Sequence, residues 1–449
     1  RMIVMKFGGT SVGGAGEMRR VRAIVADRLH LKPVVVVSAV SGVTDLLLEN
    51  ARRAKEHSRD GIRLFERFRA IHDRIIGELG LPAGVAEAEY AQLREVLHGV
   101  FYLGELTPRT LDCVVSFGER VSAKIVSALF SAGGIPSRAY TGWEAGIVTN
   151  DEHGNASPLP RTYRRVRGRL AGARRLPVVA GFIAKNVRGD ITTLGRGGSD
   201  FTAAIIGRGA GAREIQIWTN VNGIMTSDPR VVKGARTIPR LSFAEAAELA
   251  YFGAKVLHPR TIEPAVEMGI PVRILNTFEP GSPGSLVLRE APRPRSAIRA
   301  IACKKGNILF TLRSTRMLAA HGYLARIFEV FRDYAVPVDL ISTSEVSVSV
   351  TVDGVAAPRL EGIIADLGRI CTTRIFGGRT IICLVGDGIC GTPNIAGKIF
   401  GVVGRAGVNV EMISQASSAL NISFLVKDAD ADRTVRMLHR EFLARGRRA

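Results

Sequence analysis

Cysteine is scarce in this 449-residue sequence, and its five cysteines form no C-x-x-C pair. Their odd number argues against a disulfide framework. A reducing compartment fits this usage, so we expect a cytoplasmic location. His153, in a polar loop, and His258, which precedes Pro259 at the expected end of a helix, have no partners at metal-ligand spacing. We therefore predict no metal-ligand cluster and assign both histidines to capping or surface positions.

Long apolar runs and a secretory signal are also absent. The longest apolar runs, such as Pro33–Val37, have the length of a strand and fall far short of a membrane span. We expect no membrane partner. The 46% content of hydrophobic residues is nevertheless enough, in a chain of this length, for two or three domains with their own cores.

Aromatic residues make up only 6% of the chain, and acidic residues are outnumbered by 62 lysines and arginines to 41, which gives a net charge of +21. Such a charge invites a nucleic-acid hypothesis, because clustered arginines neutralise phosphates. The arginine clusters, Arg161–Arg175 and Arg445–Arg448, are short and contain few aromatic residues for stacking. We predict an arginine-rich surface that helps to collect anionic ligands such as nucleotides, and no nucleic-acid partner.

The amino-terminal segment Lys6–Val12 reads KFGGTSV and contains neither the Walker spacing G-x-x-x-x-G-K nor G-x-G-x-x-G. It follows a short apolar strand, and its two glycines allow a turn that brings N–H groups against an anion. Lys6 supplies a point charge for a phosphoryl group. The same pattern also fits an ordinary strand-to-helix connection, so distant residues must complete any phosphate site.

Apolar, β-branched runs alternate with helical stretches along the first two thirds of the chain. The expected strands are Pro33–Ser38, Pro177–Ala180, Ile215–Trp218 and Val272–Leu275, and the expected helices include Gly61–Leu79 and Gly118–Ser131. This alternation predicts an α/β domain with a mostly parallel sheet sandwiched by helices. Proline and glycine cluster between residues 278 and 296, which places the end of a first domain, 1–290, in this region.

An internal repeat occupies the last third of the chain. The residues Ile327, Phe328 and Val330 recur 72 residues later as Ile399, Phe400 and Val402. Each copy has the order of a ferredoxin-like βαββαβ unit, and we assign 300–375 and 376–449 to the two copies. The second copy ends in a helix and lacks its final strand, so we hypothesise that Ile308–Leu312 completes it.

A second glycine-rich segment, Gly195–Asp200, reads GRGGSD and is followed by a helical run. Its arginine, Arg196, can clamp a carboxylate with two parallel hydrogen bonds. Asp200 lies where a helix N-terminus meets a bound anion, and it can either orient Lys6 or hold Mg2+. Three kinds of polar group therefore lie within five residues.

These two segments and Phe252–Pro259, which reads FGAKVLHP, together resemble the aspartate kinases of the amino-acid kinase family. The resemblance covers essentially the whole chain and identifies the repeat with tandem regulatory ACT domains. It implies an ATP- and Mg2+-dependent enzyme that phosphorylates the side-chain carboxylate of L-aspartate, the first step of lysine, threonine and methionine biosynthesis. The residues agree, because a carboxylate nucleophile needs no general base but does need cations and N–H groups around it.

The resemblance also implies roles for individual residues. Glu119, in a segment expected just before a helix, pairs with the substrate ammonium, and Arg196 takes its α-carboxylate. Thr44 matches a substrate contact but also suits a helix cap, and Lys255 also suits a surface helix lysine. The full set is Lys6 and Asp200 for catalysis, Thr44, Glu119, Arg196 and Ser199 for aspartate, and Lys6, Gly8, Gly9, Thr10, Thr219, Asn220, Met225, Arg230 and Lys255 for ATP.

Two residues of the nucleotide segment depart from the pattern of the family. Asn220 stands where relatives commonly carry aspartate, and Met225 stands where they carry tyrosine. Asn220 still offers one acceptor, and Met225 can still pack against a purine. The departures leave open an alternative, a regulatory pseudokinase that binds its effector but has lost phosphoryl transfer.

The first repeat resembles the inhibitor site of lysine-sensitive aspartate kinases. Asp339 and Glu345 would share the ammonium groups of a lysine effector, although alanine and proline stand at Ala320 and Pro337 where relatives often have serine. The resemblance further implies a homodimer through the ACT domains, or a tetramer. Dimerisation alone would need none of these side chains. The expected effector residues are Met317, Ala320, Tyr323, Leu324, Val338, Asp339, Ser344 and Glu345.

Overall fold

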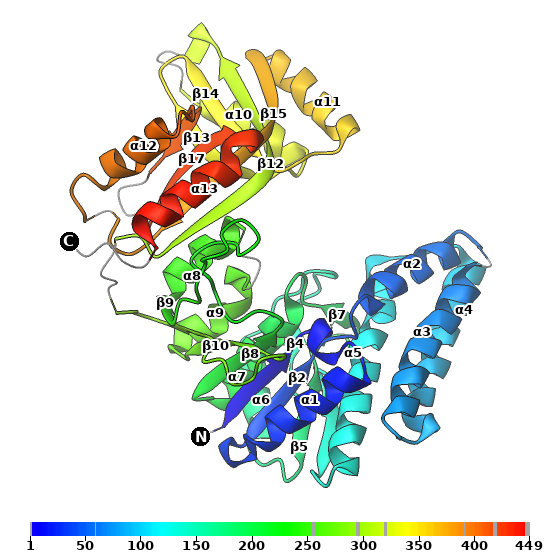
Figure 1. The fold of residues 1–449 in the computed structure, drawn as a ribbon. Coiled ribbons are helices and arrows are strands. Elements are labelled where there is room, and N and C mark those ends of the chain that lie inside the picture. The colour runs from blue at the N-terminus through cyan, green and yellow to red at the C-terminus, as the bar shows by residue number, and fades with distance from the viewer. Residues whose placement is uncertain are drawn as a thin grey trace. The chain divides into compact units, whose positions relative to one another are not determined.

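The computed structural model describes residues 2–58, 60–253, 257–292, 297–317, 321–389, 391–415 and 420–444. The chain divides into two compact units (Figure 1). Unit 1 comprises Arg1–Ile224, Pro239–Phe243 and Val256–Ala291, and unit 2 comprises Met225–Ile238, Ala244–Lys255 and Pro292–Ala449. Two short segments of the amino-terminal part therefore belong to unit 2.

An eight-stranded sheet forms the centre of unit 1, in the order β3-β5-β2-β1-β8-β10-β11-β9. The six strands from β3 to β10 are parallel, β11 is antiparallel to β10, and β9 is parallel to β11. This sheet confirms the predicted fold class. Its strands are β1 (Ile3–Phe7), β2 (Pro33–Val37), β3 (Ser137–Tyr140), β5 (Leu176–Ala180), β8 (Glu214–Thr219), β9 (Arg240–Ser242), β10 (Val272–Asn276) and β11 (Ser285–Leu288). A smaller sheet holds β4 (Val148–Thr149), β6 (Ile183–Asn186) and β7 (Ile191–Thr193).

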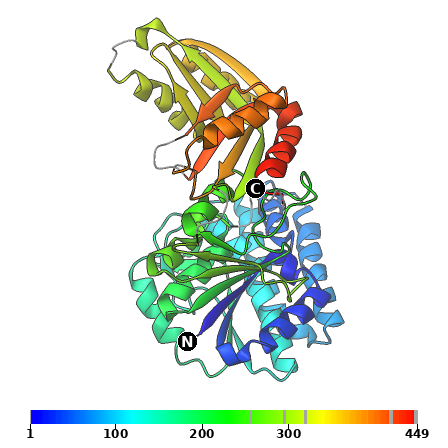
Figure 2. The ribbon, with the colours of Figure 1, turned by 60° about the vertical axis from the view of Figure 1, so that its left-hand side comes forward.

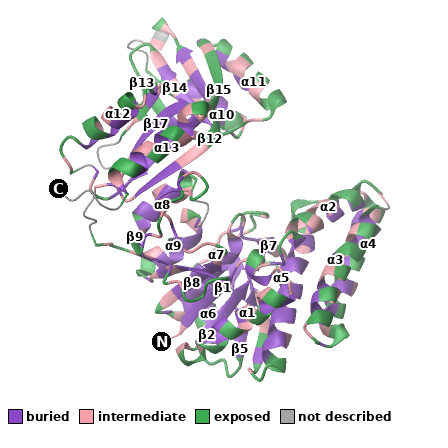
Figure 3. Cartoon of the chain, in the orientation of Figure 1, coloured by how far each residue is buried: buried purple, intermediate pink, exposed green. Residues whose placement is uncertain are grey.

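Helices cover the sheet of unit 1, whose strands β1, β2 and β5 are fully buried (Figure 3). Alternation along β1 places Ile3, Met5 and Phe7 in one core with α1 and α5, and places Lys6 toward α7. The helices α2, α3 and α4 pack together and contribute residues to the same core (Figure 1). The helices are α1 (Ala15–Ala26), α2 (Val43–Lys55), α3 (Asp60–Glu78), α4 (Glu87–Leu103), α5 (Pro108–Ala132), α6 (Arg161–Leu170), α7 (Gly198–Ala210) and α9 (Pro259–Met268).

Helix α5 begins ten residues earlier than the sequence suggested, at Pro108 rather than at Gly118. The expectation that Glu119 lies just before a helix is therefore wrong, because it lies within one. Gly118 is a contact point and not a helix start: a Cβ atom there would lie 2.9 Å from the Cβ of Ala39. The glycine lets α5 approach the segment after β2 closely, and this brings Glu119 next to that segment.

Unit 2 contains one six-stranded sheet, in the order β13-β14-β12-β15-β17-β16. Helices α12 and α13 lie side by side and share one hydrophobic core, while α10 and α11 belong to a second core (Figures 1 and 2). The strands are β12 (Ala300–Arg313), β13 (Val338–Thr343), β14 (Ser347–Val352), β15 (Thr372–Val385), β16 (Met412–Ser414) and β17 (Asn421–Lys427). The helices are α8 (Phe243–Tyr251, all but Phe243 in this unit), α10 (Tyr323–Asp333), α11 (Ala357–Gly368), α12 (Ile395–Arg405) and α13 (Asp428–Phe442).

The two repeats share the long strands β12 and β15. Residues 309–313 of β12 pair with β14 and with residues 372–376 of β15, whereas Ala300–Lys304 pairs with residues 381–385 of β15. The hypothesis that Ile308–Leu312 completes the second copy is therefore wrong, and Ala300–Lys304 takes that place. A register shift near Asn307, beside Gly306 with φ +77°, divides the strand into its two halves.

No helix in the described ranges is long and apolar enough to cross a membrane.

Candidate active site

A pocket of about 870 Å3 lies at the carboxyl ends of β1, β2 and β8. Ligands of open parallel sheets bind at this edge, where the strand order reverses, and here the order reverses at β1, between β2 and β8. The pocket brings together ten of the predicted residues from distant segments. These are Lys6, Gly8, Gly9, Thr10, Thr44, Glu119, Arg196, Ser199, Thr219 and Asn220.

Lys6, which lines this pocket, forms an ion pair with Asp200. Lys6 Nζ lies 2.6 Å from Oδ1 of Asp200, and the two side chains are only 11% and 13% exposed. Asp200 belongs to the first turn of α7, which begins after Gly197 in the left-handed conformation (φ 71°). The lysine ammonium and the helix N-terminus therefore create a positive field around a single carboxylate.

The two glycines after β1, Gly8 and Gly9, are closely packed, and one of them forms a backbone hydrogen bond within the fold. A Cβ at Gly9 would lie 3.0 Å from the carbonyl oxygen of Ala39, so the loop needs glycine there. The N–H of Gly8 donates to the carbonyl of Trp218 at 3.1 Å, which attaches the loop to β8. The expectation that both glycine N–H groups face an anion is thus wrong for Gly8, and the amides of Gly9 and Thr10 are the candidates.

Glu119 is a buried carboxylate that lines the pocket. It is 3% exposed, and its Oε2 has no hydrogen-bond partner among the described residues. Burial raises the pKa of Glu119 from 4.5 to about 8, although backbone hydrogen bonds at Ala39 and at Glu119 itself oppose the shift. Arg196 lines the same pocket and is exposed, with no carboxylate partner in the described part of the chain. The pocket thus offers one group for an ammonium and one for a carboxylate.

Asp112, on α5, positions the loops of the pocket and was missed by the sequence analysis. Its carboxylate accepts hydrogen bonds from the backbone N–H of Gly154 at 3.0 Å and from the hydroxyl of Thr193 at 2.6 Å. Its Oδ2 also lies 2.9 Å from Nδ1 of His153. The assignment of His153 to a surface or cap is therefore wrong. No pattern distinguishes Asp112 from a solvated helix residue, because its partners come from later segments.

Two other expectations about helix caps are changed by the structure. Thr44 is the second residue of α2, and the cap position belongs to Gly42 (φ 79°), so the alternative reading of Thr44 as a cap is wrong. Thr44 lines the pocket instead. His258 occupies the cap position of α9 but makes no side-chain cap hydrogen bond.

The predicted nucleotide residues are divided between the two units. Thr219 and Asn220 line the pocket of unit 1, whereas Met225 and Arg230 belong to unit 2. Arg230 is exposed and pairs with Asp228 at 2.7 Å. Lys255 lies outside the described residues.

The described residues contain no group of three or more His, Cys, Asp or Glu side chains that could hold a metal ion. Magnesium in kinase sites is commonly held by one or two carboxylates together with the substrate phosphates. The single carboxylate Asp200 fits that mode of binding, in which most ligands come from the nucleotide and from water.

Comparison with known proteins identifies the family. The model of the "Amino acid kinase family" matches residues 1–276, and an ACT domain model matches residues 382–442. Aspartokinase 2 of Arabidopsis thaliana is 39% identical over 98% of this chain and 84% of its own length. Lysine-sensitive aspartokinase 3 of Escherichia coli is 34% identical over 98% of both chains. The chain belongs to the aspartokinase family.

Solved aspartokinase structures share the fold of the whole chain. The E. coli aspartokinase III complex with aspartate and ADP has a TM-score of 0.82 at 33% identity and covers 98% of this chain and 99% of its own. The Clostridium acetobutylicum aspartate kinase has a TM-score of 0.85 at 26% identity, covering 98% and 100%. These likenesses confirm the predicted resemblance, the α/β architecture and the assignment to the ATP-dependent kinases.

The effector residues expected from the aspartokinase family lie in unit 2 around β13. Asp339 is paired on both oxygens: Lys304 Nζ lies 2.7 Å from Oδ2, and the hydroxyl of Tyr251 donates to Oδ1 at 2.8 Å. Lys304 also lies 3.0 Å from Asp353. The side chain of Asp339 is 4% exposed, so this acidic site already holds an ammonium from the chain itself.

The other expected effector residues differ in exposure and contacts. Tyr323 is buried, and its hydroxyl donates to the carbonyl of Ile370 at 2.8 Å. Its polar end is therefore already used in a hydrogen bond within the ACT domain. Ser344 pairs with Ser347 at 2.7 Å. The remaining described members, Met317, Leu324, Val338 and Glu345, are partly or fully exposed, and Ala320 lies outside the described residues.

Replacing Glu119 by glutamine should stabilise the ligand-free chain at high pH. The unfolded chain releases the Glu119 proton near pH 4.5, whereas the folded chain keeps it until about pH 8. The free energy of unfolding of the parent therefore falls as the pH rises through this window, by at most about 1.4 kcal/mol per pH unit. Glu119→Gln lacks this loss, so its advantage should grow up to about pH 8 and then stay constant.

Chemical denaturation of parent and variant between about pH 5 and pH 9 measures this difference. The exposed Glu95→Gln on α4 is the matched control and should show a pH profile parallel to that of the parent. A constant difference between Glu119→Gln and the parent across the range would contradict a raised pKa for Glu119.

Proposed function

We propose that this aspartokinase-family chain transfers the γ-phosphoryl group of ATP to the side-chain carboxylate of L-aspartate and forms 4-phospho-L-aspartate, the first step of lysine, threonine and methionine biosynthesis. The observation that carries this proposal is that one pocket is lined by Lys6, which pairs with Asp200, by Arg196, and by the buried Glu119, whose Oε2 has no hydrogen-bond partner among the described residues. Relatives carry names that agree, since one is described in complex with aspartate and ADP.

The substrate is held by its α-amino and α-carboxylate groups. An ammonium beside Glu119 favours the ionised carboxylate and opposes the effect of burial, so binding of aspartate draws the pKa of Glu119 down from about 8. The guanidinium of Arg196 takes the α-carboxylate in a two-pronged contact. With both ends held, the side-chain carboxylate remains as the nucleophile. The hydroxyls of Thr44 and Ser199 line the same pocket and supply further hydrogen bonds.

Phosphoryl transfer here brings two anions together. A carboxylate oxygen attacks the γ-phosphorus, and the bond from that phosphorus to the oxygen of the ADP leaving group breaks. Lys6 offsets the repulsion between these groups, and the amides of Gly9 and Thr10 donate to the phosphate oxygens. Asp200 holds the Lys6 ammonium in position. Bound Mg2+, with Asp200 as its protein ligand, would supply further neutralisation of the phosphates.

A hydroxylamine trap tests the proposed reaction. An acyl phosphate reacts with hydroxylamine to give aspartate hydroxamate, which should require both aspartate and ATP. Lys6→Met should lower its rate about 100-fold or more, as expected for loss of a group that stabilises developing charge. The exposed Lys55→Met on α2 is the control and should retain the parental rate. No hydroxamate from the parent under any condition would instead support the pseudokinase suggested by Asn220 and Met225.

Feedback regulation by lysine is the second part of the proposal. It rests on Asp339, whose buried carboxylate already binds the ammonium of Lys304. A lysine effector presents the same ammonium chemistry, so it competes with Lys304 for this carboxylate. A relative of similar fold is described in complex with lysine and aspartate, with a TM-score of 0.84 at 33% identity.

A homodimer through the ACT domains completes the proposal, with a tetramer built from two such dimers as its alternative. Large apolar side chains are exposed on or near the sheet of unit 2, and two of its edge strands, β13 and β16, contribute to them. Their burial against a second copy would remove this surface from water. The residues are Leu324, Ile341, Val346, Ile375, Phe376 and Ile413, which are 36–48% exposed.

Removing the internal ammonium should increase sensitivity to lysine. In Lys304→Met the effector no longer competes for Asp339, so the lysine concentration that gives half-inhibition should fall about fivefold or more. Lys305→Met, on the same strand and paired with Asp432 at 2.7 Å, is the matched control and should leave inhibition unchanged. Weaker inhibition in Lys304→Met would show that Lys304 belongs to the effector site and does not compete with the effector.

A further inference from the structure

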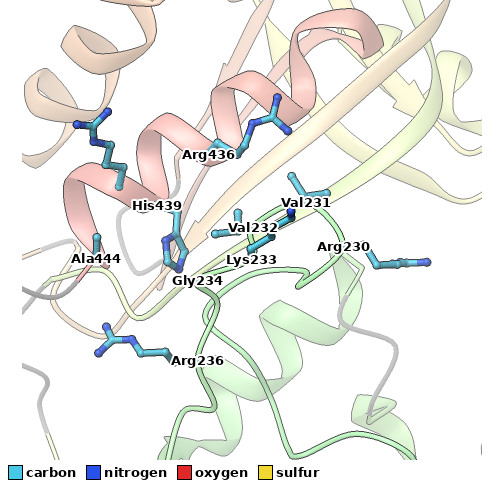
Figure 4. A pocket seen from close by; sticks show the side chains of 10 residues that line it. Arg230, Val231, Val232, Lys233, Gly234, Arg236, Arg436, His439 and Ala444 are labelled. Carbon is cyan, nitrogen blue, oxygen red and sulfur yellow. The ribbon is translucent and has the colours of Figure 1, made fainter.

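A second cavity, of about 650 Å3, lies wholly within unit 2, between the loop Arg230–Arg236 and helix α13 (Figure 4). We call it the basic cavity. Its charged and titratable lining residues are Arg230, Lys233, Arg236, Arg436, His439 and Arg440. None of the residues that line it is acidic, although the chain as a whole has 41 acidic residues.

Most of these positive charges are not neutralised by the protein. Arg230 pairs with Asp228, and Figure 4 shows its side chain extending away from α13. Lys233, Arg436 and Arg440 are exposed and have no ion-pair partner in the described part of the chain. Placing several such cations around one hollow costs electrostatic free energy that an anion would remove.

The wall of the cavity is fixed by hydrogen bonds. His439, 3% exposed, reaches from α13 toward the loop at Gly234, and its Nε2 lies 2.9 Å from the hydroxyl of Thr226. That hydroxyl also accepts from the backbone N–H of Arg236 at 3.0 Å. The guanidinium of Arg236 donates to the carbonyl of Leu443 at 2.5 Å. The loop and the end of α13 are therefore held in one arrangement, and this is the preorganisation that a binding site requires.

Stabilisation of helix α13 explains only part of the positive charge around the basic cavity. Arg440 lies in the last turn of α13, where a positive side chain offsets the helix dipole, whereas burial lowers the pKa of His439 and favours its neutral form. The same account does not apply to Lys233 and Arg236, which come from the facing loop. Two segments separated by about 200 residues in the sequence thus contribute charge of one sign to the same hollow.

We propose that the basic cavity binds a small anion that carries two or more phosphate groups. Arginine guanidinium groups match phosphate oxygens in paired hydrogen bonds, and the volume lies in the range that accommodates a molecule of nucleotide size. The lining contains no Phe, Tyr or Trp side chain on which a nucleobase or a single-stranded nucleic acid could stack, and the imidazole of its one histidine, His439, is buried and lies within hydrogen-bond distance of Thr226. Of the residues that line the basic cavity, Arg230 belongs to the set that the resemblance assigns to ATP, and none lines the pocket of unit 1.

Calorimetric titration with inorganic pyrophosphate at constant ionic strength tests the proposal. The double variant Arg436→Gln/Arg440→Gln removes two exposed charges without touching the core, so it should fold as the parent does. We expect its affinity for pyrophosphate to fall about 10- to 100-fold, since hydrogen bonds to charged groups are among the strong ones. Arg433→Gln, on the same helix but paired with Asp430 and outside the cavity, should bind as the parent does.

Further titrations distinguish binding in this cavity from binding in the catalytic pocket and identify the ligand. Lys6→Met should leave pyrophosphate binding intact, and loss of binding in that variant would assign it to the catalytic pocket and overturn the proposal. ADP that binds to Lys6→Met but not to the triple variant Lys6→Met/Arg436→Gln/Arg440→Gln would identify a nucleotide as the ligand, and binding of pyrophosphate without binding of ADP would identify an inorganic ligand. No saturable binding, equal loss in Arg433→Gln, or equally tight binding of citrate would each overturn the assignment.

Discussion

The Lys6 ammonium and the Asp200 carboxylate, 2.6 Å apart, form the contact on which the catalytic pocket depends. It joins the central strand β1 to the first turn of α7, so the two glycine-rich segments are brought to the same edge of the sheet. A partly buried ion pair is held in place by its surroundings and is little screened by solvent. The Lys6 ammonium is therefore held at a defined position, where it can offset the negative charge of two anions that approach each other.

Two residues that line the same pocket as Lys6 offer groups of opposite charge. Glu119 is a carboxylate that burial keeps protonated until a cation arrives, and Arg196 is a cation that is exposed to an incoming carboxylate. Asp112 does not line the pocket but holds Gly154 and Thr193 in place. In unit 2 the buried carboxylate of Asp339 is likewise paired with an ammonium, that of Lys304. Under the proposed regulation, a lysine effector would compete with Lys304 for this carboxylate.

Short sequence motifs predicted the parts of the structure that depend on neighbouring residues in the chain. The segments around Lys6 and Asp200 identified the pocket, and the repeat identified the composition of unit 2. The sequence could not reveal contacts that form only when distant segments meet, such as those of Asp112. Gly118 suggested a helix start because glycine is unfavourable inside helices, but close packing against Ala39 outweighs that preference. The exchange of strands between the repeats depends on a register shift near Asn307, which no hydrophobic pattern specifies.

A double-mutant cycle on Lys6 and Asp200 tests the central claim most directly. The turnover number would be measured for Lys6→Met, Asp200→Asn and the double variant in the hydroxamate assay, with folding checked by thermal unfolding. If the ion pair acts as one unit, the double variant should be about as slow as Lys6→Met alone, with an interaction energy of about 1–3 kcal/mol. Fully additive losses would contradict the account, because they would show that the two residues act independently.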